Sequence, residues 1–575
     1  MKLQKTVGQV TSPMTKVISG ESSCSSESDK TIFDYADFLD IKLASTCFRS
    51  GDCHECIVEV NSDKEVLSEK TDSEVFLPDG YRLACQAYVH SGEGEIRFEP
   101  LNRKPRILTS TVTNTEEEVL DPLVSVRDNK VFYGDLFVDR YRGGCYGLAI
   151  DLGTTTVVME LVDLESGLVC TSASVENPQS FGGSDVMSRI SYSSRSDYFE
   201  ELQKATVSAI NRVTQKMCDE VGIRPPLIYE VVVVGNTTMR DILFGVDIQS
   251  IGQRPYKSKI ETDFLEGKLT TTSITSLTRL IGIRANREAR LYSLPLISSH
   301  VGADTLAAAW AAGMNQSKTT EMLVDIGTNT EVVLWHDGNI FVASCPAGPA
   351  FEGGLVTHGM RAYEGAVESL KLDSTGKVSD FSVIGDRDPL GFCGSGLVDL
   401  LSELRINRVI NEVGVFQENP KISEMKVFDD NDLIFSREDC SNLAQAKAAN
   451  YCGQIILMRI AGVDPVDIEN LHLAGAFANY VNLKNAIEIG LLPPVDLQRV
   501  NKIGNAALDG ARQALKSQWA RDEMERLISE VTHIELETIP EFFEIFVEGC
   551  LLKPMPKDVS IFDQSEERVV SGSTK

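Results

Sequence analysis

The sequence has no long hydrophobic run and is short of basic residues. No stretch of about 18 or more consecutive apolar residues occurs in the 575-residue chain, so no transmembrane helix is expected. Lys and Arg number 55 against 84 Asp and Glu, which gives a formal net charge of −29 at pH 7. Because phosphate groups are bound by clustered Lys and Arg, this balance argues against nucleic acid or an anionic membrane as the main partner. It is compatible with a partner that carries a basic docking patch.

The two ends of the chain differ in composition from the rest. The opening residues, MKLQKTVGQVTSPM, lack the apolar core of a signal peptide, so a cytoplasmic protein is expected. Residues 1–30 are rich in Ser, Thr and Lys, which predicts a flexible leader, extended to residues 1–40, with Cys24 as a bystander. The apolar spacing in 31–45 nevertheless favours a short helix. Residues 556–575 are polar and are predicted to form a flexible tail.

Residues 146–163, YGLAIDLGTTTVVMELVD, combine two strand-like runs with a tight turn between them. In this turn Gly153 lets the backbone approach a ligand closely. The hydroxyl groups of Thr154 and Thr155, with successive backbone N–H groups, can bind phosphate oxygens. Asp151 can hold a hydrated Mg²⁺ beside that phosphate. The stretch therefore predicts a phosphate-binding turn.

The same pattern returns in residues 322–334, MLVDIGTNTEVVL. The matching positions of the second copy are Asp325, Gly327, Thr328 and Asn329. One such turn is often an ordinary hairpin, but two copies 174 residues apart favour two similar lobes on either side of a nucleotide cleft.

Other small-residue turns add candidates for this cleft. Asp185 follows a glycine-rich loop at the start of a predicted helix, where it either orients a water or Mg²⁺ or caps the helix. Asn236 ends a strand, where ligand-facing residues collect in α/β sheets. His300 and Asp304 precede or begin an alanine-rich helix that either approaches the cleft or serves packing. A glycine loop covers 348–354, and the candidates to frame the nucleoside are Gly394, Ser395, Gly475 and Ala476.

The grouping of the 13 cysteines is more informative than their number, since so long a chain is not a disulfide scaffold. Cys47, Cys53 and Cys56 lie close together, and Cys85 follows after 28 residues, which gives the pattern C-x5-C-x2-C…C. Three thiolates in one loop can wrap an iron–sulfur cluster while a distant fourth closes it. Zn²⁺ binding and reduced structural thiols are the alternatives. His54 is predicted to be a solvent-facing loop residue.

The cysteine pattern resembles the loops of vertebrate-type and related [2Fe–2S] ferredoxins. Strands predicted at 57–60, 74–77 and 95–98 suit a β-grasp ferredoxin-like module over residues 41–100. The loop departs from that pattern because Gly51 is its one glycine, and no N-terminal hairpin is evident before Cys47.

The two turns resemble the phosphate motifs of the actin, sugar kinase and Hsp70 superfamily. The predicted architecture is therefore multidomain, with a small α+β module followed by a two-lobed α/β, actin-like (ribonuclease H-like) ATPase fold. The expected segments are a linker or small subdomain with a strand pair at 101–143, a first lobe at 144–320 and a second lobe at 321–555.

A four-cysteine module joined to such an ATPase is similar to the reductive activators of corrinoid proteins. The shared motifs, together with the four-cysteine loop, are IDLGTTT, NPQxxxGxDVxSRI, VVVVGNTTM, DIGTNTE, CPAGPAFEGG, GFCGSGLVD and LAGAFANYVNL. The resemblance implies one-electron reduction of Co(II) to Co(I) in a corrinoid protein of a methyltransferase system, with ATP, Mg²⁺, a [2Fe–2S] cluster and an upstream electron donor. Residues 101–143 are short, so a separate middle domain is expected to be missing or reduced. A homodimer is compatible with the sequence.

Three other functions remain open from the sequence. The chain could activate a radical dehydratase, in which a [4Fe–4S] cluster lies between two subunits. It could be an ATP-switched binding protein with a degenerate cluster loop, as the scarcity of glycine suggests. A small-molecule kinase is the third, but it gives the cysteines no role.

Overall fold

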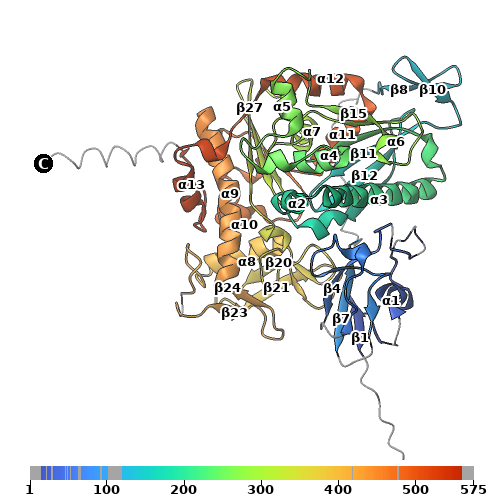
Figure 1. Ribbon diagram of the computed structural model, residues 1–575. Coiled ribbons are helices and arrows are strands. Elements are labelled where there is room, and N and C mark those ends of the chain that lie inside the picture. Colours follow the sequence, from blue (N-terminus) through green and yellow to red (C-terminus); the bar gives the residue numbers. More distant parts are fainter. Residues whose placement is uncertain are drawn as a thin grey trace, which may run out of the picture. The chain divides into compact units, whose positions relative to one another are not determined.

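The computed structural model describes residues 15–559 apart from 21, 27–29, 44, 46, 48, 52, 63–65, 91–93, 102–119, 418 and 476–477 (Figure 1). The chain divides into two compact units. The first is Met1–Lys104 with Val175–Arg212, and the second is Pro105–Ser174 with Val213–Lys575. None of the described helices has the length and hydropathy that crossing a membrane would need.

The first unit contains a five-stranded sheet in the order β2-β1-β7-β4-β5, with β1 and β7 parallel. Helix α1 (Ile32–Phe38) buries Ile32 and Phe33, and it begins at Thr31 with a reciprocal cap to Asp34. This mixed sheet with one helix confirms the predicted ferredoxin-like module. Its strands are β1 (Lys16–Ser19), β2 (Ser22–Ser25), β4 (Ile57–Ser62), β5 (Tyr81–Leu83) and β7 (Glu95–Pro100), beside the pair β3 (Lys30–Thr31) and β6 (Tyr88–Val89).

Two local predictions for this unit are wrong. The flexible leader of residues 1–40 is contradicted over Lys16–Phe38, because β1 and β2 form a hairpin, Cys24 lies in β2, and Val17 and Ile18 are buried in the sheet. Residues 1–14 lie outside the described part. The strand at 74–77 is absent, because Asp72–Glu74 form a 3₁₀ turn, η2. There the Glu74 carboxylate accepts hydrogen bonds from Thr71 and Arg82, which favours the turn over an extended strand.

The first unit also contains a helical segment that follows the first lobe's opening strands. It comprises η3 (Pro178–Gly182), α2 (Val186–Tyr192) and the start of α3 (Ser196–Val221), which continues into the second unit. Asp185 is the N-cap of α2, since its carboxylate accepts from the backbone N–H of Ser188 at 2.9 Å and from the Ser188 hydroxyl at 2.7 Å.

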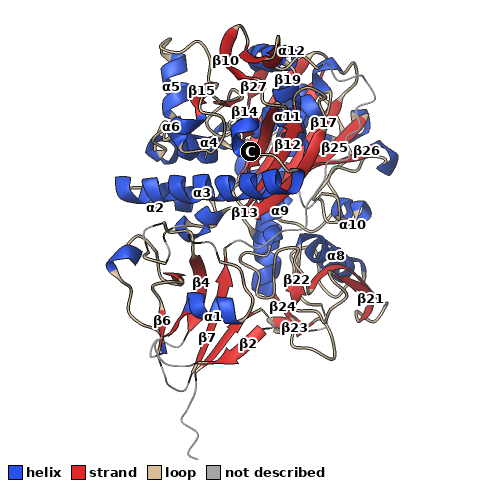
Figure 2. Ribbon diagram, turned by 90° about the vertical axis from the view of Figure 1, so that its right-hand side faces the viewer, coloured by secondary structure: helices blue, strands red, loops and turns tan. Residues whose placement is uncertain are grey.

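The second unit contains two six-stranded sheets that repeat one arrangement (Figure 2). In each, the strand before the phosphate turn pairs antiparallel with the strand after it and parallel with a later strand. The internal repeat and the two-lobed fold are thus confirmed. The first sheet has β11 (Tyr146–Leu152), β12 (Thr156–Asp163), β13 (Val169–Glu176), β14 (Ile228–Val234), β15 (Ile274–Leu277) and β16 (Arg290–Ser293). The second has β17 (Glu321–Ile326), β18 (Thr330–His336), β19 (Asn339–Cys345), β25 (Asn470–Ala474), β26 (Val500–Gly504) and β27 (Val531–His533).

Helices and small sheets surround these two sheets. The predicted strand pair within 101–143 is confirmed and gains a third strand. The helices are α4 (Thr237–Phe244), α5 (Lys259–Leu265), α6 (Thr278–Ile281), α7 (Ala303–Ala311), α8 (Gly394–Ile406), α9 (Arg437–Ala461), α10 (Leu483–Glu488), α11 (Ala506–Lys516), α12 (Gln518–Leu527) and α13 (Phe542–Gly549). The small sheets are β8 (Val124–Arg127), β9 (Lys130–Tyr133) and β10 (Leu136–Arg140); β20 (Ala366–Leu372), β21 (Val378–Val383) and β22 (Gly391–Phe392); and β23 (Glu424–Lys426) with β24 (Ile434–Ser436).

In the C-terminal part, one helix of the predicted second lobe packs against the first sheet, and the predicted start of the tail is wrong. Helix α11, which the sequence placed in the second lobe, packs along α7 and against β11 of the first sheet (Figure 1). The approach is so close that a Cβ on Gly510 would lie 2.2 Å from the Ala307 carbonyl oxygen. The predicted tail begins too early, because Val559 is buried and its N–H donates to Asp464 at 2.8 Å. Residues 560–575 lie outside the described part.

Lys447 of α9 is a fully buried cation. Its ammonium group donates to the carbonyl oxygens of Ile489 at 2.9 Å and Leu551 at 2.7 Å. Burial lowers the pKa of Lys447 from 10.5 to about 7. Between these values the unfolded chain binds more protons than the folded one, so this residue makes stability rise with pH.

We expect Lys447→Met to reveal that dependence. The wild type should gain stability relative to the variant between pH 7 and 10, by at most about 1.4 kcal/mol per pH unit. Urea denaturation at both pH values measures the difference, and Lys484→Met, at an exposed position of the neighbouring helix α10, is the control. A difference between wild type and Lys447→Met that is the same at both pH values would contradict the prediction.

Candidate functional site

A cavity of about 290 Å³ lies between the two repeated turns in the second unit. It brings together the predicted residues Asp151, Gly153, Thr154, Thr155, Asp325, Gly327, Thr328, Asn329, Gly394, Ser395 and Gly475. Ala476 lies outside the described residues. Asp185 belongs to the other unit and has the capping geometry that the sequence offered as the alternative. Its catalytic role stays a prediction.

Two glycines of the cavity, Gly153 and Gly475, are required by close backbone approach. In the first turn the N–H of Gly153 donates to the Thr156 carbonyl at 3.0 Å, and a Cβ on Gly153 would lie 2.7 Å from that oxygen. In the second, Gly327 donates to the Asn329 carbonyl at 3.1 Å. Gly475 has φ +95° and passes the second turn so closely that a Cβ would lie 2.5 Å from the Ile326 carbonyl oxygen.

Buried carboxylates gather at the base of the cavity. Burial raises the pKa of Asp151 to about 7, although the hydrogen bond from Asn505 opposes this shift. The charges of Asp304 and Asp325 add a smaller increase. Burial and Asp304 raise the pKa of Asp325 to about 7 as well. Burial raises the pKa of Asp304 to about 6. Desolvation thus destabilises the charged form of each carboxylate, and neighbouring negative charge does so as well for Asp151 and Asp325. A hydrated Mg²⁺, which binds oxygen ligands, would stabilise these charged forms.

Asparagine side chains fix the first turn from two directions. The Asn505 amide, at the N-cap of α11, donates to Asp151 at 2.8 Å. The Asn236 amide, at the N-cap of α4, donates to the Thr154 hydroxyl at 2.8 Å. The sequence pointed to Asn236 as a strand-end residue but missed Asn505. The one local sign of Asn505 in the sequence is that a polar residue stands between a predicted strand and a helix with a small-residue face.

A carboxylate joins the two turns through their threonine hydroxyl groups. Glu352, from the 3₁₀ turn η7 (Ala350–Glu352), accepts the Thr155 hydroxyl at 2.7 Å and the Thr328 hydroxyl at 2.6 Å. The two hydroxyl oxygens are 3.2 Å apart. The sequence named Glu352 only as part of the glycine loop and gave it no role.

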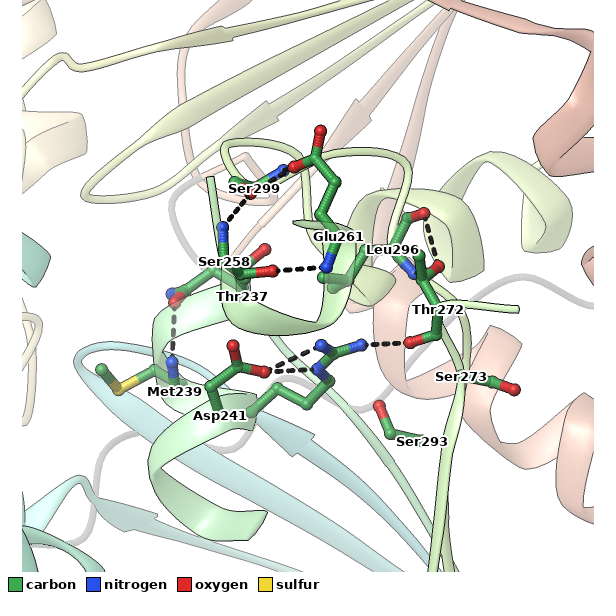
Figure 3. A network of polar contacts seen from close by, with 12 residues as sticks. Thr237, Met239, Asp241, Ser258, Glu261, Thr272, Ser273, Ser293, Leu296 and Ser299 are labelled. Carbon is green, nitrogen blue, oxygen red and sulfur yellow. Dashed lines mark hydrogen bonds and ion pairs between the residues drawn. The ribbon is translucent and has the colours of Figure 1, made fainter. Parts of the chain in front are cut away.

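A buried polar network joins α4 to neighbouring segments of the first lobe (Figure 3). The Arg240 guanidinium donates to Asp241 at 2.8 Å and to the Thr272 carbonyl at 2.8 Å, and both side chains of the ion pair are fully buried. The Thr237 hydroxyl donates to the Ser298 carbonyl at 3.2 Å. These contacts tie α4, which carries Asn236 at its start, to the loop that precedes Asp304.

We expect Asp241→Ala to lower the free energy of unfolding by about 3–5 kcal/mol, because it leaves a buried guanidinium without its counter-charge. Denaturant unfolding of the apoprotein measures the loss. The control is Glu266→Ala, which removes an exposed ion pair with Lys268 and should have a far smaller effect on stability. Equal effects of the two variants would contradict the structural role of the buried pair.

The four cysteines of the first unit form two side-chain pairs, Cys47 with Cys53 and Cys56 with Cys85. Although burial opposes it, hydrogen bonds from Ser50 and Cys53 lower the pKa of Cys47 to about 5. A hydrogen bond from Cys56 lowers the pKa of Cys85 to about 7, although burial and the Cys47 charge oppose this. Cys47 and Cys53 are half-buried, whereas Cys56 and Cys85 are buried. Among the described residues, no three His, Cys, Asp or Glu side chains gather around one metal-sized point.

Side-chain tethers hold the loop where glycine is scarce. Arg49 has φ +70° and His54 has φ +55°, a left-handed conformation that favours glycine. Arg49 pairs with Asp34 at 2.9 Å and stacks over Phe33. The His54 ring is 2.5 Å from the Glu201 carboxylate of α3, so the prediction of a solvent-facing His54 is wrong.

A second tether joins the same stretch to α3. Glu55 accepts the Ser208 hydroxyl at 2.7 Å, one residue before Cys56. The His54 ring also stacks on Phe76 with centroids 4.4 Å apart. These contacts hold the backbone between Cys53 and Cys56 in a loop that has one glycine.

Comparison with known proteins gives three family matches. The model described as a 2Fe-2S iron-sulfur cluster binding domain matches residues 17–90. The model of the RACo middle region matches 146–317, and that of the C-terminal domain of RACo, the ASKHA domain, matches 319–564. The middle-region match coincides with the first lobe, so the expectation of a missing or reduced middle domain is wrong.

Individual relatives cover nearly the whole chain. The corrinoid activation enzyme RamQ of Eubacterium limosum is 28% identical over 582 residues, covering 90% of this chain and 95% of that protein. The [Co(II) methylated amine-specific corrinoid protein] reductase of Methanosarcina barkeri is 22% identical, covering 70% and 76%. The solved structure of a reductive activator for corrinoid,iron-sulfur protein is 28% identical with a TM-score of 0.67, covering 94% of this chain and 98% of that one.

Proposed function

The chain belongs to the family of reductive activators of corrinoid proteins, and from this we propose that it reduces the cobalt of a corrinoid protein from Co(II) to Co(I) with the use of ATP. The observation that carries the proposal is the presence, in one chain, of two thiol pairs in a ferredoxin-like module and of a cavity built from two repeated phosphate turns. The named relatives that activate or reduce corrinoid proteins support it. We infer that the partner is the corrinoid protein of a methyltransferase system.

The thiols are proposed to hold a [2Fe–2S] cluster, which supplies one electron at low potential. In such a cluster each iron takes two protein thiolates, and the pairs Cys47 with Cys53 and Cys56 with Cys85 fit that requirement. A zinc site would need four ligands around one ion. The lowered pKa of Cys47 favours the thiolate form that binds iron. Cys56 and Cys85 share a hydrogen bond that raises the pKa of Cys56 and lowers that of Cys85, so that pair favours one thiolate.

The cavity is proposed to bind ATP with Mg²⁺. Thr154, Thr155, Thr328 and the turn N–H groups would contact phosphates, and the aspartates at the turns would hold the hydrated metal ion. Gly394, Ser395 and Gly475 would frame the nucleoside. Because the two turns belong to different lobes, a ligand bound by both changes the equilibrium between lobe angles, and this is how ATP would alter affinity for the two redox states of the partner.

An anaerobic assay tests the function. Protein reduced by dithionite is mixed with a Co(II) corrinoid protein, and the Co(I) absorption band is followed with and without ATP. We expect the band to grow in the presence of ATP and Mg²⁺ and to grow far less without them. No ATP-dependent change with any cognate corrinoid protein would contradict the proposal.

Iron content separates this function from activation of a radical dehydratase. Two irons and two sulfides per chain after anaerobic reconstitution, with the EPR signal of a reduced [2Fe–2S] cluster, are expected here. Four irons shared by two chains would instead indicate the dehydratase type of activator. A protein without visible absorption would indicate an ATP-switched binding protein with a degenerate loop.

A further inference from the structure

The hydroxyl groups of the two phosphate turns are directed at one carboxylate. Glu352 accepts both, at 2.7 Å from Thr155 and 2.6 Å from Thr328, so each of its oxygens contacts a different lobe's turn. Its position is set by backbone, because Gly353 follows with φ +88° and a Cβ there would lie 2.4 Å from the Met360 nitrogen. The side chain is therefore fixed at the mouth of both turns.

Hydrogen-bond stoichiometry makes this contact incompatible with bound phosphate. A threonine hydroxyl has a single proton to donate, and the oxygens of a nucleotide phosphate are acceptors. When Thr155 and Thr328 donate to Glu352, they cannot donate to a phosphate as well. A nucleotide that binds through these hydroxyls must take both protons from Glu352, which leaves a carboxylate without its two donors beside the phosphate.

A carboxylate in that state suits proton abstraction. Loss of two donors and a nearby negative charge both make a carboxylate a better proton acceptor. The two turn aspartates are less suitable, because Asp151 is bonded to Asn505 and both Asp151 and Asp325 are proposed to hold Mg²⁺. Glu352 instead faces the hydroxyls that contact phosphate, where an attacking water would lie within hydrogen-bond reach.

We propose that Glu352 is the general base of ATP hydrolysis. Glu352 accepts a proton from a water whose oxygen attacks the terminal phosphorus, while the bond from that phosphorus to the bridging oxygen breaks. ADP leaves with the electron pair of the broken bond, and the proton is released from Glu352 as inorganic phosphate departs. This role rests on the proposed ATPase function and assigns the residue that the sequence left open beside Asp185.

Glu352→Gln separates catalysis from binding, since an amide keeps the shape and one acceptor oxygen but cannot act as a base. We expect kcat for ATP hydrolysis by the full-length protein to fall by about 10²- to 10³-fold. The Kd of a non-hydrolysable ATP analogue with Mg²⁺, measured by calorimetry, should change by less than about threefold. The matched control is Glu364→Gln, an exposed carboxylate of the same segment that pairs with Arg387.

Chemical rescue provides a second readout. Glu352→Ala opens space in the cavity, and added formate should restore part of its hydrolysis, whereas formate should leave the wild type unchanged. A kcat of Glu352→Gln equal to that of the wild type would overturn the assignment. Loss of analogue binding in proportion to the loss of kcat, without rescue by formate, would also overturn it, because Glu352 would then have a purely structural role. A wild-type protein that hydrolyses no ATP would contradict the proposed function itself.

Discussion

Replacement of Cys56 by serine is expected to abolish the visible absorption of the cluster and the reduction of Co(II). Cys56 is 1% exposed and lies at the start of β4, where its side chain contacts that of Cys85. A serine there leaves one iron with a single thiolate in a buried place that water cannot enter to replace the lost ligand. Iron and sulfide content and the absorption spectrum after anaerobic reconstitution measure the effect.

Two further cysteine variants serve as comparisons, one with an expected partial loss of cluster and one as a control. Cys47→Ser should retain a weaker cluster signal, since Cys47 is half-exposed and solvent can complete the ligand set. Cys170→Ser, at an exposed cysteine of β13, should have a full complement of iron. If Cys56→Ser kept normal iron content and spectrum, the four cysteines would not be the ligand set. Binding of an ATP analogue should persist in all three variants, because the nucleotide cavity lies in the other unit.

Asp325→Asn is expected to lower kcat for ATP hydrolysis by about three orders of magnitude, or roughly 4 kcal/mol of transition-state stabilisation. Burial and Asp304 make this carboxylate unfavourable in the apoprotein. The proposed Mg²⁺ would remove that cost and neutralise charge on the phosphates, whereas an amide is a poor ligand for a hard divalent cation. Hydrolysis rates across a Mg²⁺ titration measure the effect.

The same substitution, Asp325→Asn, should stabilise the apoprotein while it impairs hydrolysis. Removing one of several buried, mutually repelling carboxylates should raise the melting temperature of the metal-free protein at pH 8, while the gain in melting temperature on adding Mg²⁺ and nucleotide shrinks. Asp380→Asn, on the exposed strand β21 of the same lobe, is the control. Normal hydrolysis by Asp325→Asn would contradict the proposed metal site.

Local sequence predicted the nucleotide turns well because each is a short, self-contained pattern. A buried strand ending in Asp-x-Gly-Thr has few alternative structures, and its repetition after 174 residues implied the second lobe. The order of the cysteines likewise indicated the module. Predictions were wrong where distant partners decide the structure. Strand β1 is short and unremarkable in sequence, and it is held by its parallel pairing with β7, nearly 80 residues later in the chain.

The glycine content of the cysteine loop was incomplete evidence for a related reason. The scarcity of glycine in the cysteine loop suggested a degenerate site, because only local backbone freedom is visible in a sequence. In the fold, the left-handed residues Arg49 and His54 are held by Asp34 of α1 and Glu201 of α3. The cost of their backbone conformation, about 1 kcal/mol or more each, is offset by these tethers.

The sequence by itself determined which chemical groups the protein has and their order: four thiols, two aspartate-led phosphate turns and a set of glycine corners. Only the tertiary structure decided which groups meet. It placed Glu352 against Thr155 across 197 positions and Asn505 against Asp151 across 354. The physical reason is that turns and caps depend on neighbouring residues, whereas a side chain's partner across a cavity depends on how whole sheets and helices pack.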